Sequence, residues 1–260
     1  MAYQATVGTS AGIAVNKIRL VDLVHAVEEG IADFQEKPTH LFFLAVIYPV
    51  ATLFAFMVVN NDRLVPLVFP ILAGLVLIGP FIGLAMEEMS RHRERGLDMS
   101  WGHAFNFFEH PAFKDILMLG LLNIALFLGW VAAANTVFVM TMGDGWSTTA
   151  ADFTTRALTT PQGWSMIIVG NALGFLFAVA ALLFGVISFP ILLDKNCGLG
   201  AAVVTSVRAV MVNPIPMAAW GLFVGVCLVL GAIPLLVGLA VVVPVLGHAT
   251  WHLYRKMVSA

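Results

Sequence analysis

Residues 217–254 read MAAWGLFVGVCLVLGAIPLLVGLAVVVPVLGHATWHLY, an apolar stretch of 38 positions. A helix crosses a bilayer in about 20 mostly apolar residues, so this stretch is long enough to cross nearly twice. Gly231 and Pro234 lie near its middle, where glycine and proline favour a turn. The stretch therefore predicts two transmembrane helices joined by a tight turn, over residues 217–232 and 235–254.

Four similar runs precede this stretch, and polar or charged residues bound each of them. They cover residues 40–59, 64–86, 116–142 and 166–193. Only 11% of the residues are charged, whereas soluble domains have about 25%. The sequence thus predicts an all-α polytopic membrane protein in which residues 38–260 form six transmembrane helices.

The lysines and arginines predict the orientation, because they concentrate in cytoplasmic loops. With the N-terminus inside, the inner segments carry all of these residues except Arg63 and Arg156. Residues 1–37 are therefore expected to form a cytoplasmic N-terminal segment, and the C-terminus is expected on the same side. The formal net charge of -2 gives no reason to expect nucleic acid as a partner.

Three inner segments have the periodicity of amphipathic helices lying on the cytoplasmic surface: residues 20–34, 100–108 and 201–212. In the first of them, apolar residues recur at helical spacing from Leu20 to Phe34. The acidic side chains of that helix are expected on the opposite, polar side: Glu28, Glu29 and Asp33.

The second, fourth and sixth spans each carry a proline in their cytoplasmic halves: Pro80, Pro190 and Pro244. This correspondence suggests a threefold internal repeat of a helical hairpin followed by a surface helix. Three apolar helices with one proline each would also match by chance, and that alternative stays open.

Three motifs carry a resemblance to a known family: SFPILLD at residues 188–194, TSVRAV at residues 205–210 and PVLGHATWHLYR at residues 244–255. With these motifs, the chain resembles a family of uncharacterised prokaryotic integral membrane proteins, some of which are labelled putative cytochrome c oxidase. The resemblance implies a location in the bacterial inner membrane and no settled activity. Direct oxygen chemistry is not expected, because spans three, four and five contain no histidine.

Five ionisable residues lie at or near the inner ends of the even-numbered spans: Glu87, Glu88, Asp194, His248 and His252. They would form one polar cluster if the repeat packs as a ring. The two histidines, four positions apart, share a helix face, as two ligands to one metal or haem would. They are also suited to hydrogen bonding and to anchoring at the interface, and the acidic residues to marking the membrane boundary.

Three amides lie inside the third and fourth spans: Asn123, Asn135 and Asn171. Amides in lipid usually hydrogen-bond between helices, so packing is the favoured explanation. The alternative is that they line a substrate path.

No motif for phosphate binding, nucleophilic catalysis or zinc hydrolysis occurs in the sequence. We therefore expect a non-catalytic protein of the lipid bilayer, an accessory subunit or assembly factor of another membrane complex. A respiratory, oxidase-type complex is the expected partner because of the family label. The alternative is a small transporter or permeation protein with a pocket in the cytoplasmic halves of spans two, four and six.

Overall fold

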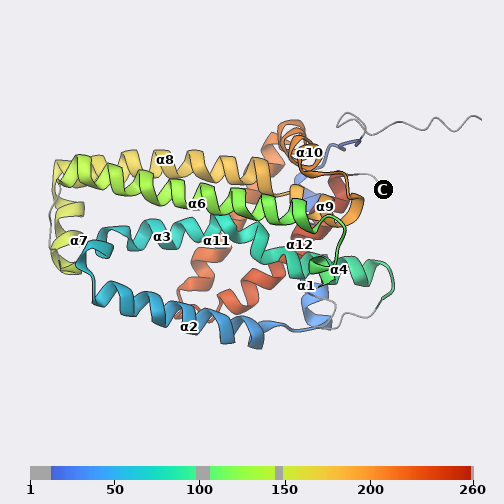
Figure 1. The fold of residues 1–260 in the computed structure, drawn as a ribbon, viewed down its shortest axis with the longest axis horizontal. Helices are drawn as coiled ribbons and strands as arrows, with labels where there is room; N and C mark the ends of the chain where they lie inside the picture. Colours follow the sequence, from blue (N-terminus) through green and yellow to red (C-terminus); the bar gives the residue numbers. More distant parts are fainter. Residues whose placement is uncertain (1–12, 98–105, 144–148, 259–260) are drawn as a thin grey trace, which may run out of the picture. The chain divides into compact units, whose positions relative to one another are not determined.

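The computed structural model describes residues 13–97, 106–143 and 149–258, and the regular secondary structure of this part of the chain is helical apart from one isolated β-bridge. Figure 1 follows the elements from blue α1 to red α12. Along the chain they are α1 (Leu20–Glu36), α2 (His40–Val59), the 3-10 helix η1 (Asp62–Leu67), α3 (Val68–Gly74), the 3-10 helix η2 (Leu75–Ile78), α4 (Gly79–Glu94), the 3-10 helix η3 (Asn106–Phe108), α6 (Phe113–Met142), α7 (Ala150–Thr159), α8 (Pro161–Gly185), α9 (Ser188–Lys195), α10 (Leu199–Val212), α11 (Pro214–Ala232) and α12 (Leu239–Met257). The expected all-α architecture is confirmed.

Five helical runs in the described part of the chain are long and apolar enough to cross a membrane. They are α2, residues 63–94, α6, residues 161–195 and α11. The predicted sixth span corresponds to α12, whose C-terminal half carries histidine, arginine and lysine side chains. The chain therefore has five to six candidate spans, and the sixth stays a prediction.

The second and fourth spans are interrupted where the sequence predicts continuous helices. Span two passes through η1, α3 and η2 before α4 begins, and span four changes from α8 to α9. Pro80 and Pro190 lie in the first turns of α4 and α9. Proline has no N–H to bond to the preceding turn, so a new helix begins there more readily than an old one continues.

Other helix predictions have mixed outcomes. The segment expected at residues 201–212 forms α10 and ends, as predicted, just before Asn213 and Pro214. The segment expected at residues 100–108 lies largely outside the described residues, which include only η3 from it. Helix α7 was not predicted, and Thr149 caps it by accepting a hydrogen bond from the backbone N–H of Asp152 at 3.2 Å. Nothing in these elements tests the threefold repeat.

The chain divides into two compact units, each with its own core. Unit 2 comprises residues 45–79 and 122–181. There the Trp130 indole donates a hydrogen bond to the Pro70 carbonyl at 2.7 Å, and Gly74 leaves room for the same ring. Since a side chain at Gly74 would collide with Trp130, this glycine permits α3 and α6 to pack closely.

Unit 1 comprises the described residues up to Leu44, residues 80–121 and the residues from Leu182 onward. Its apolar core includes Leu84 of α4, Phe189 of α9 and Trp251 of α12. Helices α1 and α12 pack side by side in it (Figure 1). The Asn213 amide also ties the segment before α1 to the end of α10, since it donates to the Asn16 carbonyl and accepts from the Ile18 N–H.

The predicted orientation of α1 is wrong at Asp33. Its buried residues are Leu23, Ala26, Gly30 and Asp33, whereas Leu20, Val24 and Ile31 of the predicted apolar stripe are exposed. The reason is that the small residues on the buried side of α1 let α12 approach closely. The polar partners of Asp33 lie on this buried side as well. Apolar periodicity does not reveal those partners, because they lie on distant parts of the sequence.

Candidate functional site

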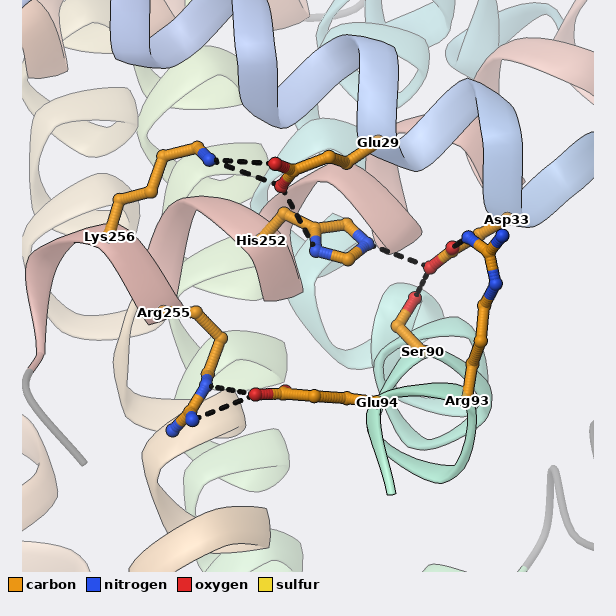
Figure 2. A pocket seen from close by; sticks show the side chains of 8 residues that line it. All are labelled: Glu29, Asp33, Ser90, Arg93, Glu94, His252, Arg255 and Lys256. Atoms are coloured by element: carbon orange, nitrogen blue, oxygen red, sulfur yellow. Dashed lines mark hydrogen bonds and ion pairs between the residues drawn. The ribbon is translucent and has the colours of Figure 1, made fainter. Parts of the chain in front are cut away.

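A buried carboxylate, Asp33, joins three helices of unit 1. Its side chain is 0% exposed and accepts hydrogen bonds from Ser90 and Arg93 of α4 and, at 2.8 Å, from His252 Nε2 of α12. Ser90 Oγ lies 2.8 Å from His248 Nδ1, which extends the network along α12. Figure 2 shows these side chains, apart from that of His248, converging from α1, α4 and α12.

The protonation state of Asp33 fixes the directions of these hydrogen bonds. Burial raises the pKa of Asp33, but the hydrogen bonds from His252, Ser90 and Arg93 outweigh it and hold the pKa below its ordinary value of 3.8. An ionised carboxylate only accepts, so the single hydroxyl hydrogen of Ser90 points to Asp33. His248 must then donate from Nδ1 to Ser90, which assigns its tautomer.

Serine, histidine and aspartate are present here, but their order is not that of a nucleophilic triad. In a triad the serine bonds to a histidine whose other nitrogen bonds to the carboxylate. Here Ser90 bonds directly to Asp33, and Ser90 is only 1% exposed. The arrangement therefore links helices rather than presenting a nucleophile to a substrate.

A pocket of about 610 Å³ opens beside this network (Figure 2). Three acidic, three basic and two further polar side chains line it: Glu29, Asp33, Glu94, Arg93, Arg255, Lys256, Ser90 and His252. Its acids and bases are equal in number and pair with one another, so the lining has no formal excess of either charge.

Three helices surround this pocket, and every pair of them is connected by an ion pair. Lys256 of α12 lies 3.0 Å from Glu29 of α1, and Arg255 of α12 lies 2.8 Å from Glu94 of α4. The Arg93–Asp33 pair joins α4 to α1. His252 adds a second contact to α1, since its Nδ1 lies 3.3 Å from Glu29.

The other predicted acidic residues belong to separate networks. Asp194 accepts a hydrogen bond from the Tyr254 hydroxyl at 2.6 Å and lies 3.4 Å from Arg255. Glu88 lies 2.5 Å from Arg91, whose guanidinium also donates to the Leu193 carbonyl at 2.7 Å.

Glu88 Oε2 and His248 Nε2 have no hydrogen-bond partner in the described part of the chain, although another atom of each side chain is paired. Glu87 differs from both, because no ion pair joins it to a described residue. It is 1% exposed, and its Oε2 has no hydrogen-bond partner in the described part of the chain. The structure thus brings Glu87, Glu88, Asp194, His248 and His252 into unit 1 but distributes them over several networks.

The sequence interpretation missed Asp33, Ser90, Arg93 and Glu94. One signal was available for Asp33. Ala26 and Gly30 lie three to seven positions before it, on the same helical face, and small residues at this spacing indicate a close helix contact. An acidic residue continuing that face needs partners on the neighbouring helix.

The three predicted amides differ in their surroundings. Asn171 donates to the Ile167 carbonyl of its own helix at 2.8 Å, and Asn135 is exposed. Asn123 is buried, and neither its side-chain nitrogen nor its oxygen has a partner among the described residues. Hydrogen bonding of these amides between helices stays a prediction.

A metal or haem at His248 and His252 also stays a prediction. The described residues contain no group of three or more histidine, cysteine or acidic side chains that could hold a metal ion. His248 contacts Ser90 through Nδ1 and His252 contacts Asp33 through Nε2, whereas the buried His248 Nε2 has no hydrogen-bond partner among the described residues.

Replacement of Asp33 by asparagine is expected to flatten the acid dependence of stability. Because the pKa of Asp33 is lowered on folding, its contribution is full above about pH 3.8 and is lost as pH falls through its folded-state pKa. Unfolding of the wild-type protein and of Asp33→Asn, compared at pH 7 and pH 3, should show the smaller loss in the variant. Equal losses in both proteins would contradict the role given to Asp33.

Residues 68–194 match the family model described as predicted integral membrane protein (DUF2189). The match confirms the resemblance seen in the sequence and runs from α3 to α9. The motifs at residues 205–210 and 244–255 lie outside the range matched to DUF2189. Comparison with curated proteins and with solved structures gives no match. Together with the five apolar helices, the DUF2189 match indicates an integral membrane protein that lies in a lipid bilayer.

Proposed function

We propose that this chain is a non-catalytic accessory subunit or assembly factor that packs against another protein in the membrane. The observation that carries the proposal is the state of α2. Phe43 is the one buried residue of this 20-residue apolar helix. Helices in lipid associate through close packing, so a spanning helix with little packing inside its own unit is suited to a partner helix.

The polar site supports a structural role. Apart from Glu87, its carboxylates bond to arginine, lysine, histidine or hydroxyl groups of the same chain, as Asp33, Glu88 and Asp194 each do. Side chains engaged in this way hold helices together and are not free to act on a substrate. A non-catalytic protein is expected to have such a site.

The transporter alternative requires a pocket around the three prolines. The close packing of the described residues in this region does not favour such a pocket. Pro190 and Pro244 are themselves buried. Large apolar side chains also fill this region of unit 1: Leu84, Phe189, Ile191, Leu192 and Leu246. The pocket described above lies among charged side chains of α1, α4 and α12.

The kind of partner and the location follow from the resemblance. The family label favours a respiratory, oxidase-type complex of the bacterial inner membrane. The lysine and arginine distribution supports cytoplasmic N- and C-termini.

Cross-linking from α2 tests the proposal. A photoreactive amino acid at Phe56, which is 65% exposed, is expected to capture a membrane protein in cells that express the chain at its native level. Mass spectrometry of the mild-detergent complex should recover the same protein, and the proposal expects respiratory subunits.

The matched control is Leu222 of α11, which is 70% exposed on a helix that contributes Met217 and Trp220 to the core of unit 1. The same reagent at Leu222 is expected to label lipid. Lipid labelling at both positions, with recovery of this chain alone, would overturn the proposal.

A further inference from the structure

Glu87 is a buried carboxyl group in a different situation from its neighbour Glu88. Both are at most 1% exposed, but Glu88 lies 2.5 Å from the Arg91 guanidinium. Glu87 Oε2 has no hydrogen-bond partner among the described residues. One of two adjacent carboxyl groups is therefore neutralised by a counter-charge and the other is not.

Glu87 lies beside a close contact between α4 and α12. A methyl group built on Gly83 would lie 3.4 Å from the Gly247 Cα and 4.0 Å from Glu87 Oε1. A methyl group built on Gly247 would meet the Met86 Cβ at 2.8 Å. The two backbones therefore approach closely at these glycines, and the Glu87 carboxyl group is next to their contact.

The charged groups on the helices packed around Glu87 pair with residues other than Glu87. On α4, Arg91 and His92 pair with Glu88, and Arg93 pairs with Asp33 and Glu36 of α1. Titratable groups of α12, and Arg95 just after α4, also have their own partners: His248 with Ser90, His252 with Asp33 and Glu29, Arg255 with Glu94 and Asp194, Lys256 with Glu29, and Arg95 with Asp194. None of these pairs supplies Glu87 with a positive charge.

An ionised carboxylate that is buried without a counter-charge is costly, and ionisable groups in membrane helices are generally functional. From this geometry we infer that Glu87 is a proton-binding site within the α4–α12 contact. The carboxyl group keeps its proton while the helices are together. It releases the proton to water only when the helices separate enough to hydrate it. Proton binding is thereby coupled to a helix movement, independently of the proposed partner.

Infrared spectroscopy of the full chain, labelled with carbon-13 at the glutamate side-chain carboxyl, tests the protonation directly. At neutral pH the wild-type protein should show the C=O band of a protonated carboxyl group, and Glu87→Gln should lack it. Glu28→Gln, which changes an exposed glutamate of α1, should retain the band. A wild-type spectrum with only ionised carboxylate bands would overturn the inference, and this measurement needs no variant to fold.

Thermal unfolding tests the coupling to helix separation. As pH rises from 6 to 10, the wild-type midpoint should fall by about 3 °C more than that of Glu87→Gln, because the Glu87 carboxyl group is ionised in the unfolded chain but keeps its proton in the folded one. Equal pH dependence of the two midpoints would show that ionisation of Glu87 does not separate the helices.

Discussion

Replacement of Glu88 by glutamine is expected to lower the free energy of unfolding by about 3–5 kcal/mol. Glu88 is 0% exposed, and the side chain of its partner Arg91 is 10% exposed. Removing one partner of a buried ion pair leaves the other charge without compensation, and that penalty exceeds the value of the pair itself. Equilibrium unfolding in mixed micelles of the wild-type protein and of Glu88→Gln measures the loss in the free energy of unfolding.

A double variant separates this explanation from simple disruption of packing. When Arg91→Met accompanies Glu88→Gln, the Arg91 charge is no longer left without its counter-charge, so much of the lost stability should return. Glu28→Gln on the exposed side of α1 is the control and should change stability little. A double variant that is less stable than Glu88→Gln alone would contradict the ion-pair explanation.

The membrane architecture was predictable because it depends on local composition. The run at residues 40–59 coincides with α2, and the stretch at residues 217–254 does contain two helices joined by a turn. Prolines in the first turns of α4 and α9 were visible as well, although hydropathy alone did not show that they interrupt the helices. The average hydropathy of an apolar run is the same whether the helix that it forms is continuous or interrupted.

The site was predictable only in part, because its contacts join distant residues. The sequence identified His252 and placed it near the inner end of a span, but its partner Asp33 is 219 positions away. Asp33 was instead assigned to the solvent side of α1, since acidic residues usually occupy the polar face of an amphipathic helix. No single-sequence pattern specifies which carboxylate pairs with which histidine or arginine.

Glycines in unit 1 let the helices that carry its polar residues pack closely together. Gly30 of α1 and Gly247 of α12 permit backbone approaches that side chains would prevent. These approaches bring Asp33 within hydrogen-bond distance of His252 and set Glu87 beside α12. The polar network therefore depends on close packing of helices and does not by itself create it.

Replacement of Gly30 by alanine is expected to weaken the packing of α1 against α12. The new methyl group would lie 2.6 Å from the backbone nitrogen of Ala249 and 2.8 Å from its Cα, and backbone atoms yield less readily than a flexible side chain. Overpacking of this kind typically costs about 1–3 kcal/mol, whereas the intrinsic helix preference for alanine over glycine returns about 1 kcal/mol. Unfolding measurements should show a net loss, with faster hydrogen exchange across α1.

Gly225→Ala on α11 isolates the two effects, because a methyl group there meets no atom within 4 Å. Only the helix preference should act at that position, so Gly225→Ala is expected to keep or slightly raise stability. The difference between the two glycine variants therefore measures the α1–α12 contact itself. If Gly30→Ala behaves like Gly225→Ala, then α1 does not lie against α12 as described, and Asp33 cannot be the residue that joins the three helices.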